Sequence, residues 1–316
     1  MPISAHYWTI APPILHRVAG HAAPASEHWQ TVIQDPQAGP VKLTGRLRRK
    51  DGGAGTLLVV VHGLGGHAAS GYAIRAAVAA EHAGLDCLRL NLRGADRSGE
   101  DFYHAGLTDD LAAALAIPEA GAYQTILLLG YSLGGHLVLR YASGEPDSRV
   151  RAAAAVCAPL ELDSCCAAMD RPALWLYRRY LLAGLNDIYR RVAARRPVPV
   201  PVEVARRIRT LRAWDEAVVA PRHGFSSAED YYAKASVAPQ LRDLKVPSLL
   251  LASTRDPMVP VETLRPWVSP AHPALHVRWL ERGGHVGFPS GLDLQQKEAP
   301  PGLEPQVLRW LLNAAG

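Results

Sequence analysis

Short apolar runs rich in branched residues alternate along this chain with segments of helical periodicity, and this alternation is the feature that most restricts its fold. The runs cover residues 57–61, 87–92, 125–129, 152–156, 248–251 and 275–280, and the helical patterns cover residues 72–82, 109–116 and 133–141. Such alternation predicts an α/β fold with a mostly parallel central sheet and helices on both faces. Residues 41–47, followed by RRKDGGAG, indicate an additional antiparallel strand and turn.

The alternation stops after residue 157 and resumes only near residue 246. This interval contains apolar residues at helical spacing, then the proline-broken stretch RPVPVPVE, then a second helical pattern over residues 204–217; the first group is Leu174, Tyr177, Leu181 and Leu185. A segment of this length is too long for a loop. We therefore expect one domain over residues 1–316, with residues 160–245 inserted between core strands as a helical cap above the carboxyl ends of the strands.

The stretch LLLGYSLGGHL contains a G-x-S-x-G motif with Ser132 at its centre. The motif alone is weak evidence, because a chain with 27 glycines can contain it by chance. Here, however, a strand pattern precedes Ser132 and a helical pattern follows it. A sharp turn between strand and helix is the setting in which a nucleophilic serine stands clear of the sheet. The context therefore favours Ser132 as a nucleophile over a small residue in a glycine-rich turn.

A serine hydroxyl needs a base to accept its proton and a third group to orient that base. In folds of this kind the acid and then the histidine follow later strands. Asp256 comes after the run PSLLLAST, and His285 comes after LHVRWLERGG. Taken singly, an Asp-Pro turn or a loop histidine is an ordinary structural feature. Their shared position past strand ends, in the expected order, predicts a Ser132–His285–Asp256 triad.

An oxyanion hole requires two backbone N–H groups near the nucleophile. We expect one from Leu133, which follows Ser132, and one from Leu64 in the glycine-rich loop after residues 57–61. His62 is expected to brace this loop and not to serve as a second base. The loop lacks the G-x-x-x-x-G-K spacing of a nucleotide site, and the chain shows no metal-ligand spacing such as H-E-x-x-H. No cofactor and no metal are therefore expected.

Charge and cysteine content limit the partners and the compartment. The formal net charge is +5, and eleven arginines lie between Arg171 and Arg212 against two acids. This cluster fits either a solvated helical surface or peripheral contact with an anionic membrane. A nucleic-acid role is disfavoured, because no aromatic interleaving or known module accompanies the arginines. The cysteine spacing, the absence of a signal-like amino terminus and the lack of a long apolar run favour a cytoplasmic protein.

Seven stretches of the chain closely resemble the YheT-like branch of the α/β-hydrolases, relatives of medium-chain esterases, acyltransferases and phospholipases. They are HGLGGHAASGY, LNLRGADRSGE, YHAGLTDDL, GYSLGGHLVLRY, RTLRAWDEAVVAPRHGFSSAEDYYAKAS, RDPMVP and ERGGHVGF, and they span residues 62–288. The resemblance implies an α/β-hydrolase fold with Ser132 as nucleophile, Asp256 as acid and His285 as base. The segment LRGADRSG departs from the family pattern after Arg93-Gly94, where Cys-Gly-Gly is usual, so substrate preference could differ.

Together these features predict a serine hydrolase that cleaves small-molecule or lipid esters of short to medium acyl chains through an acyl-enzyme. An acyltransferase shares every step but the final acceptor, and a non-catalytic binding protein of the same fold is a further alternative. Intact Ser132, Asp256 and His285 argue against the binding protein. Natural substrate, acyl length, head group and oligomeric state stay open at this point.

Overall fold

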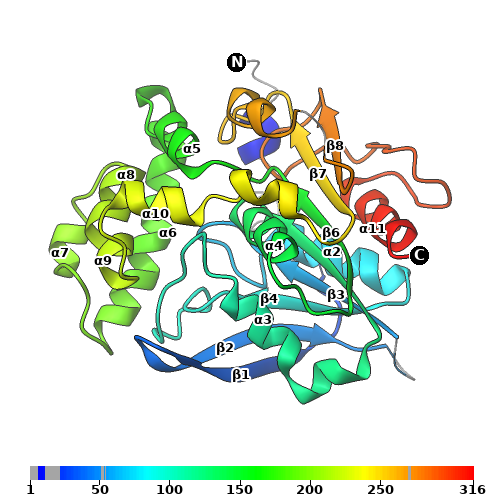
Figure 1. Cartoon of the computed structure of the whole chain (residues 1–316), viewed down its shortest axis with the longest axis horizontal. Coiled ribbons are helices and arrows are strands. Elements are labelled where there is room, and N and C mark those ends of the chain that lie inside the picture. The colour runs from blue at the N-terminus through cyan, green and yellow to red at the C-terminus, as the bar shows by residue number, and fades with distance from the viewer. Residues whose placement is uncertain (1–5, 11–21, 51–52, 54, 270–271) are drawn as a thin grey trace.

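A computed structural model describes residues 6–10, 22–50, 53, 55–269 and 272–316. Within this part of the chain a single eight-stranded sheet runs through the molecule in the order β1-β2-β4-β3-β5-β6-β7-β8 (Figure 1). All neighbours from β4 to β8 are parallel, whereas β2 pairs antiparallel with β1 and β4. The strands are β1 (Glu27–Asp35), β2 (Gly39–Arg48), β3 (Thr56–Val61), β4 (Asp86–Asn91), β5 (Thr125–Tyr131), β6 (Val150–Val156), β7 (Ser248–Ser253) and β8 (Leu275–Leu280).

Helices cover both faces of the sheet, as the alternating pattern predicts. On one face α2 (Gly71–His82) and α11 (Leu303–Ala314) pack over side chains such as Leu58, Leu127 and Leu251. On the other face α3 (Asp109–Ala116) and α4 (Leu133–Ser143) pack over side chains such as Val59 and Leu128. Successive strand residues point to opposite faces, and both faces are covered. The central strands are therefore apolar throughout, as in other buried parallel sheets.

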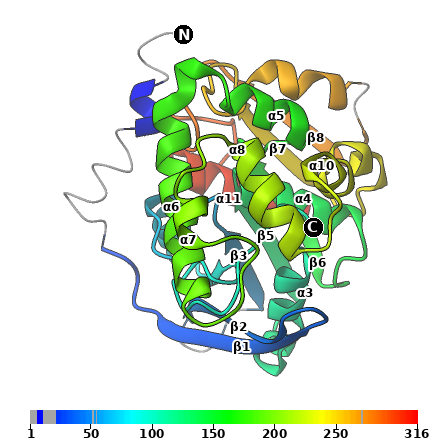
Figure 2. The same ribbon diagram turned by 90° about the vertical axis from the view of Figure 1, so that its left-hand side faces the viewer.

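The segment between β6 and β7 is helical, as expected. It contains α5 (Leu162–Met169), α6 (Trp175–Ala193), α7 (Val202–Ala205), α8 (Leu211–Trp214), a π-helical turn (Asp215–Val219), α9 (Ala220–Arg222) and α10 (Ala228–Ala235). We call this segment the insertion. It forms one side of the molecule, and the turned view looks onto it with α6, α7 and α8 in front of β3 and β5 (Figure 2). None of the helices in the described ranges is long and apolar enough to cross a membrane.

Several features of the chain differ from the expectations or lie outside the described residues. The expectation of a continuous helix over residues 204–217 is wrong, because α7 ends at Ala205 and α8 begins only at Leu211. The break follows from capping, because the Thr210 hydroxyl accepts the N–H of Ala213 and Asp170 accepts those of Leu211 and Arg212. Strand β1 and helix α11 were not anticipated. Outside the described residues lie most of the amino-terminal stretch that was expected not to be a signal, and residues 51, 52 and 54 of the stretch RRKDGGAG.

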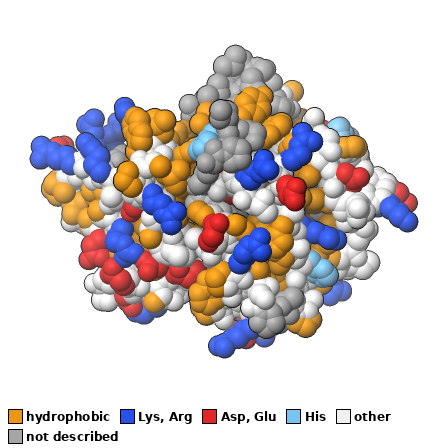
Figure 3. Space-filling view, turned by 90° about the horizontal axis from the view of Figure 1, so that it is seen from above, with side chains coloured by type: hydrophobic (Ala, Val, Ile, Leu, Met, Phe, Trp, Pro, Cys, Tyr) orange, Lys and Arg blue, Asp and Glu red, His pale blue; other side chains and the backbone are white. Residues whose placement is uncertain are grey.

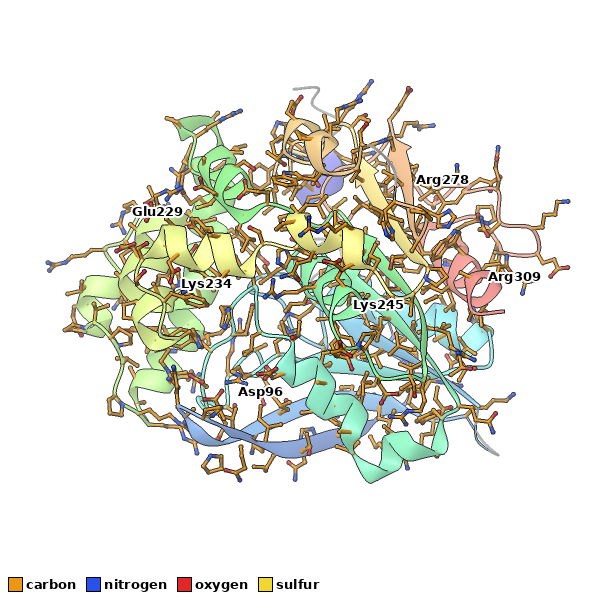
Figure 4. The ribbon with its side chains drawn as sticks, in the orientation of Figure 1. Asp96, Glu229, Lys234, Lys245, Arg278 and Arg309 are labelled. Carbon is orange, nitrogen blue, oxygen red and sulfur yellow. The ribbon has the colours of Figure 1, made fainter. Side chains whose placement is uncertain are left out.

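The arginines of the insertion do not form one free positive surface. Arg212 pairs with Asp163 and Glu229, and Arg196 donates to the carbonyl oxygens of Ala38 and Pro40. On α10, Glu229 and Lys234 are exposed side chains on the outer side of the insertion (Figure 4). Seen from above, Lys and Arg side chains are spread among acidic and hydrophobic ones (Figure 3). Contact with an anionic membrane therefore stays a prediction, with a charge pattern that favours it only weakly.

A buried arginine ties the loop after β4 to the rest of the fold. Arg93 is 1% exposed and binds Asp110 at the start of α3 through its backbone N–H, Nε and Nη2, at 2.9, 3.0 and 2.7 Å. Its Nη1 also contacts Asp35 and Asp101. Asp101 in turn accepts a hydrogen bond from Nε of Arg222 in the insertion and forms an ion pair with its Nη2. The charge of Arg93 is thus compensated in a dry environment, where an unpaired charge would be costly.

Replacing Asp110 tests this network. Asp110→Ala should lower the free energy of unfolding by about 3 kcal/mol, because it removes the principal partner of a buried cation. Asp109→Ala is a matched control on the exposed side of the same helical turn, and it should cost about 0.5 kcal/mol or less. Urea titrations followed by circular dichroism give both values. Equal losses for the two variants would show that the buried pairs contribute no more than surface charges.

Candidate active site

Ser132 occupies a strained turn between β5 and α4. Its backbone has φ +52° and ψ −120°, a conformation that a residue with a side chain seldom adopts. The Ser132 N–H donates to Val156 O at 2.8 Å, and its carbonyl oxygen accepts the N–H of His136 in the first turn of α4. These bonds hold Ser132 in a backbone conformation that would otherwise be unfavourable. Such strain is typical of functional positions.

Glycines make this turn possible. A Cβ on Gly130 would lie 2.2 Å from the carbonyl oxygen of Gly134, and one on Gly134 would lie 2.3 Å from that of Val61 at the end of β3. In the neighbouring loop, a Cβ on Gly63 would lie 3.0 Å from the Cβ of Ser132. Strand β5, helix α4 and the loop after β3 therefore meet at backbone contact, as the G-x-S-x-G pattern implies.

The structure brings the three residues of the expected triad together. The distance from Ser132 Oγ to His285 Nε2 is 2.9 Å, and that from His285 Nδ1 to Asp256 Oδ2 is 2.8 Å. Asp256 and His285 are buried at 4% and 6% exposure, and Ser132 is partly accessible. An imidazole whose Nδ1–H donates to the carboxylate presents an Nε2 lone pair to the serine hydroxyl. The arrangement can therefore accept a proton from Ser132.

Turns after β7 and β8 orient the acid and the histidine. Asp256 Oδ1 accepts the backbone N–H groups of Met258 and Val259 at 2.8 and 3.1 Å, which leaves Oδ2 for the imidazole. The backbone N–H of His285 donates to Thr9 Oγ1 at 2.9 Å, so residues 6–10 contact the histidine loop. Each side chain thus follows the carboxyl end of a parallel strand, where ligands of open α/β sheets bind.

The loop after β3 leaves one backbone donor unpaired beside Ser132. The N–H of Gly63 donates to the Tyr72 hydroxyl, that of Gly65 to the Tyr103 hydroxyl, and that of Gly66 to Gly63 O. The N–H of Leu64 has no acceptor among the described residues, and neither has that of Leu133. Both groups expected to form the oxyanion hole are thus free to donate to a ligand.

His62 braces this loop, as expected. Its Nδ1 donates to Gly63 O at 2.8 Å, and its Nε2 accepts the N–H of Leu92 at 3.2 Å. Burial lowers the pKa of His62 to about 4, so the ring is neutral at neutral pH. With both ring nitrogens bonded to the backbone, His62 connects the ends of β3 and β4.

Cys157, Asp256 and His285 form the one group among the described residues whose spacing could suit a metal, with ligand atoms within 4.8 Å of one another. Burial, and then the charge of Asp256, raise the pKa of the Cys157 thiol well above its ordinary value. A protonated thiol is a poor ligand, and His285 Nδ1 already binds Asp256. The chemistry of this group therefore fits a hydrogen-bonded pair beside a neutral thiol better than a metal site.

A cavity of about 820 Å³ opens beside Ser132 and extends under the insertion. Of the four apolar residues that the sequence places at helical spacing at the start of the insertion, Tyr177, Leu181 and Leu185 line the cavity, whereas Leu174 packs in the core. Residues 95–98, where the chain departs from the family pattern, do not line it. Several lining residues were not anticipated from the sequence: Trp8, Ile10, Phe102, His104, Met169, Trp214, Tyr231, Tyr232 and Met258.

The insertion also contains the carboxylates Asp215 and Asp230. Asp230 pairs with Lys234 at the surface of α10, and Asp215 accepts a hydrogen bond from Tyr232. Neither is bonded to His285. Tyr231 and Tyr232, which line the cavity near Asp215, are adjacent in the sequence. Aromatic side chains ordinarily pack in the core, so this pair did not indicate a cavity.

Comparison with known proteins identifies relatives of this chain. Residues 56–290 match the family described as alpha/beta hydrolase fold. The chain is 32% identical to "Putative esterase YheT" of Escherichia coli K12, over 80% of this chain and 76% of that one. It is 25% identical to human phospholipase ABHD3, over 74% of this chain and 59% of that one. A monoacylglycerol lipase of Saccharomyces cerevisiae is 24% identical, over 73% of this chain and 54% of the lipase.

Solved structures share the fold at low identity. The esterase Pf2001 of Pyrococcus furiosus superposes with a TM-score of 0.54 at 17% identity, covering 83% of this chain and 85% of that one. A hydrolase from Pseudomonas aeruginosa gives 0.52 at 18% identity, covering 90% and 97%. The mostly parallel sheet, the helical insertion and the match over residues 56–290 lead to one conclusion: the chain belongs to the α/β-hydrolase family, in the branch that includes YheT.

Proposed function

We propose that this hydrolase is a serine esterase that cleaves carboxylic esters of short to medium acyl chains. The observation that carries the proposal is the continuous hydrogen-bond chain from Ser132 through His285 to Asp256, at the edge of a largely apolar cavity. The names of the relatives, which include an esterase, a phospholipase and a monoacylglycerol lipase, support ester substrates of this kind.

In the proposed first step, His285 Nε2 takes the proton of Ser132 while Oγ attacks the ester carbonyl carbon. The carbonyl oxygen becomes an oxyanion, which the N–H groups of Leu64 and Leu133 stabilise. Asp256 holds the tautomer of His285 and compensates the positive charge that forms on the ring. Collapse of the tetrahedral intermediate releases the alcohol, which takes the proton from His285, and leaves an acyl-Ser132 ester.

The second step repeats the first with water as the nucleophile. His285 removes a proton from water, the hydroxide attacks the acyl-enzyme, and Ser132 recovers its proton as the acid leaves. An alcohol in place of water would give acyl transfer by the same steps. The residues that activate the acceptor are identical in both cases, so product analysis with added alcohol measures the balance between the two.

The first test is covalent labelling of Ser132. A fluorophosphonate probe should label the wild-type protein, and Ser132→Ala should abolish both labelling and ester hydrolysis, because the alanine carries no oxygen to attack the probe. Ser143→Ala, at the far end of α4, is a matched control, since the Ser143 hydroxyl donates to Leu139 O. Mass spectrometry of the labelled peptide identifies the site. Labelling of Ser132→Ala at the wild-type level would place the nucleophile elsewhere.

The second test concerns the acid. Asp256→Asn should lower kcat by a factor on the order of 10⁴, because an amide that donates to Nδ1 would stabilise the wrong tautomer of His285. Asp230→Asn is the control, since Asp230 lies on the surface and pairs with Lys234. A loss under tenfold in Asp256→Asn would assign the role to another carboxylate.

The third test concerns acyl length. The cavity walls include Leu162, Met169, Leu181 and Leu185, so each methylene of an acyl chain buried there should contribute about 0.8 kcal/mol. That value corresponds to a rise of about fourfold in kcat/KM per carbon until the cavity is full. Esters of p-nitrophenol from about two to twelve acyl carbons measure this profile. A flat or steadily falling profile would mean that the cavity does not bind the acyl chain.

A further inference from the structure

Asp215 is a carboxylate in the wall of an otherwise largely apolar part of the cavity. It begins the π-helical turn Asp215–Val219 of the insertion. Around it the cavity is lined by Met169, Trp214 and Val219. π-Helical turns interrupt ordinary helices at some energetic cost and are frequent at functional sites. The proposed mechanism gives this residue no part in the chemistry.

The two oxygens of Asp215 have different surroundings. Oδ2 accepts a hydrogen bond from the Tyr232 hydroxyl at 2.7 Å. Oδ1 accepts none from the described residues. The side chain keeps some accessible surface, and it lines the cavity. A partly accessible carboxylate therefore forms part of the cavity wall.

Other acids of the insertion have partners that Asp215 lacks. Asp170 accepts the backbone N–H groups of Leu211 and Arg212, and Asp187 pairs with Arg97. Arg212, three residues before Asp215, directs its guanidinium to Asp163 and Glu229 at the surface. Asp215 thus has a phenol on one oxygen and no ion pair among the described residues.

The electrostatic environment agrees with this geometry. Burial raises the pKa of Asp215 to about 7, and the negative charge of Asp170 adds to this, while the Tyr232 hydroxyl and the charge of Arg212 act in the opposite direction. The thiol of Cys166, which also contacts the Tyr232 hydroxyl, has its own pKa raised by burial. A carboxyl held in such surroundings is costly unless a donor satisfies its free oxygen.

We propose that Asp215, positioned by Tyr232, binds a hydrogen-bond donor at the end of a substrate chain, namely a hydroxyl or an ammonium group. The proposal rests on the proposed esterase function and specifies its substrate. A chain with a hydroxyl at the right distance from the ester satisfies Oδ1 when it fills the cavity. A simple alkyl chain of equal length excludes water from the filled cavity and leaves Oδ1 unpaired. Such sites discriminate strongly, because a bound substrate that lacks the donor group leaves the carboxylate oxygen without a hydrogen bond.

Chain length provides the test. Two series of esters, one with unsubstituted chains and one with a terminal hydroxyl, are compared at each length, with the variable chain first on the acyl side and then on the alcohol side. In the wild type, the ratio of kcat/KM for the hydroxylated to the unsubstituted ester should peak at one length, at least about tenfold above the ratio at shorter lengths. If Asp215 served only to stabilise the fold, kcat/KM would depend on chain length in the same way for both series. The ratio would then show no peak.

Variants of Asp215 separate the possible ligands. Asp215→Leu should remove the peak and favour the unsubstituted chain, because the wall becomes apolar throughout. Asp215→Asn keeps a polar group, so it should retain part of the preference for a hydroxyl. For esters with a terminal ammonium, kcat/KM should fall at least about tenfold in this variant, because binding an ammonium requires the negative charge. Asp230→Asn, on α10 of the same insertion, serves as the matched control and should keep the wild-type peak.

A binding measurement keeps the result independent of catalysis. Calorimetric titration of the wild type with fatty acids and with their terminally hydroxylated counterparts should show the same preference at the same chain length. Turnover of esters with no preference at any length, on either side of the ester, would overturn the role of Asp215 and leave the esterase function intact. Absence of all ester turnover would instead contradict the esterase function, and the titration would then decide the role of Asp215 alone.

Discussion

Backbone contact between β5, α4 and the end of β3 is the constraint on which the site depends. With no side chains at Gly130 and Gly134, the helix can start directly against the strands, and Ser132 is forced into its left-handed conformation. The same contact brings the loop after β3 against Ser132, which leaves the Leu64 N–H beside the serine. One packing arrangement thus brings together the proposed nucleophile and the backbone N–H groups proposed to form the oxyanion hole, before any side-chain interaction contributes.

The parts of the fold that follow from local pattern could be predicted from the sequence. Apolar runs located six strands, and the rule that parallel strands present their carboxyl ends at one edge placed Ser132, Asp256 and His285 near one another. Strand β1 is half exposed and carries polar residues between its apolar ones, so its pairing with β2 was not evident. Helix α11 was missed for a different reason, since it follows a long stretch without regular structure.

The interior of the insertion depends on contacts between residues distant in sequence, which periodicity does not reveal. Asp170 ends one helix and accepts the first N–H groups of α8, so the helix expected over residues 204–217 is broken and the π-helical turn begins at Asp215. The cavity wall likewise combines the loop after β4 with the insertion, which ion pairs such as Arg97 with Asp187 hold together. The sequence shows which residues these segments contain, but it does not show that they line one cavity.

The bond between Thr9 and the backbone of His285 has a consequence for how the protein is handled in the laboratory. Residues 6–10 are separated from the histidine loop by almost the whole chain, yet Trp8, Thr9 and Ile10 form part of the cavity wall. An affinity tag, a fusion partner or a trimmed amino terminus would therefore change the wall of the cavity beside Ser132 and would not be a remote modification. Kinetic constants from differently assembled expression vectors would describe different pockets, and a carboxyl-terminal tag is the safer choice for comparing variants.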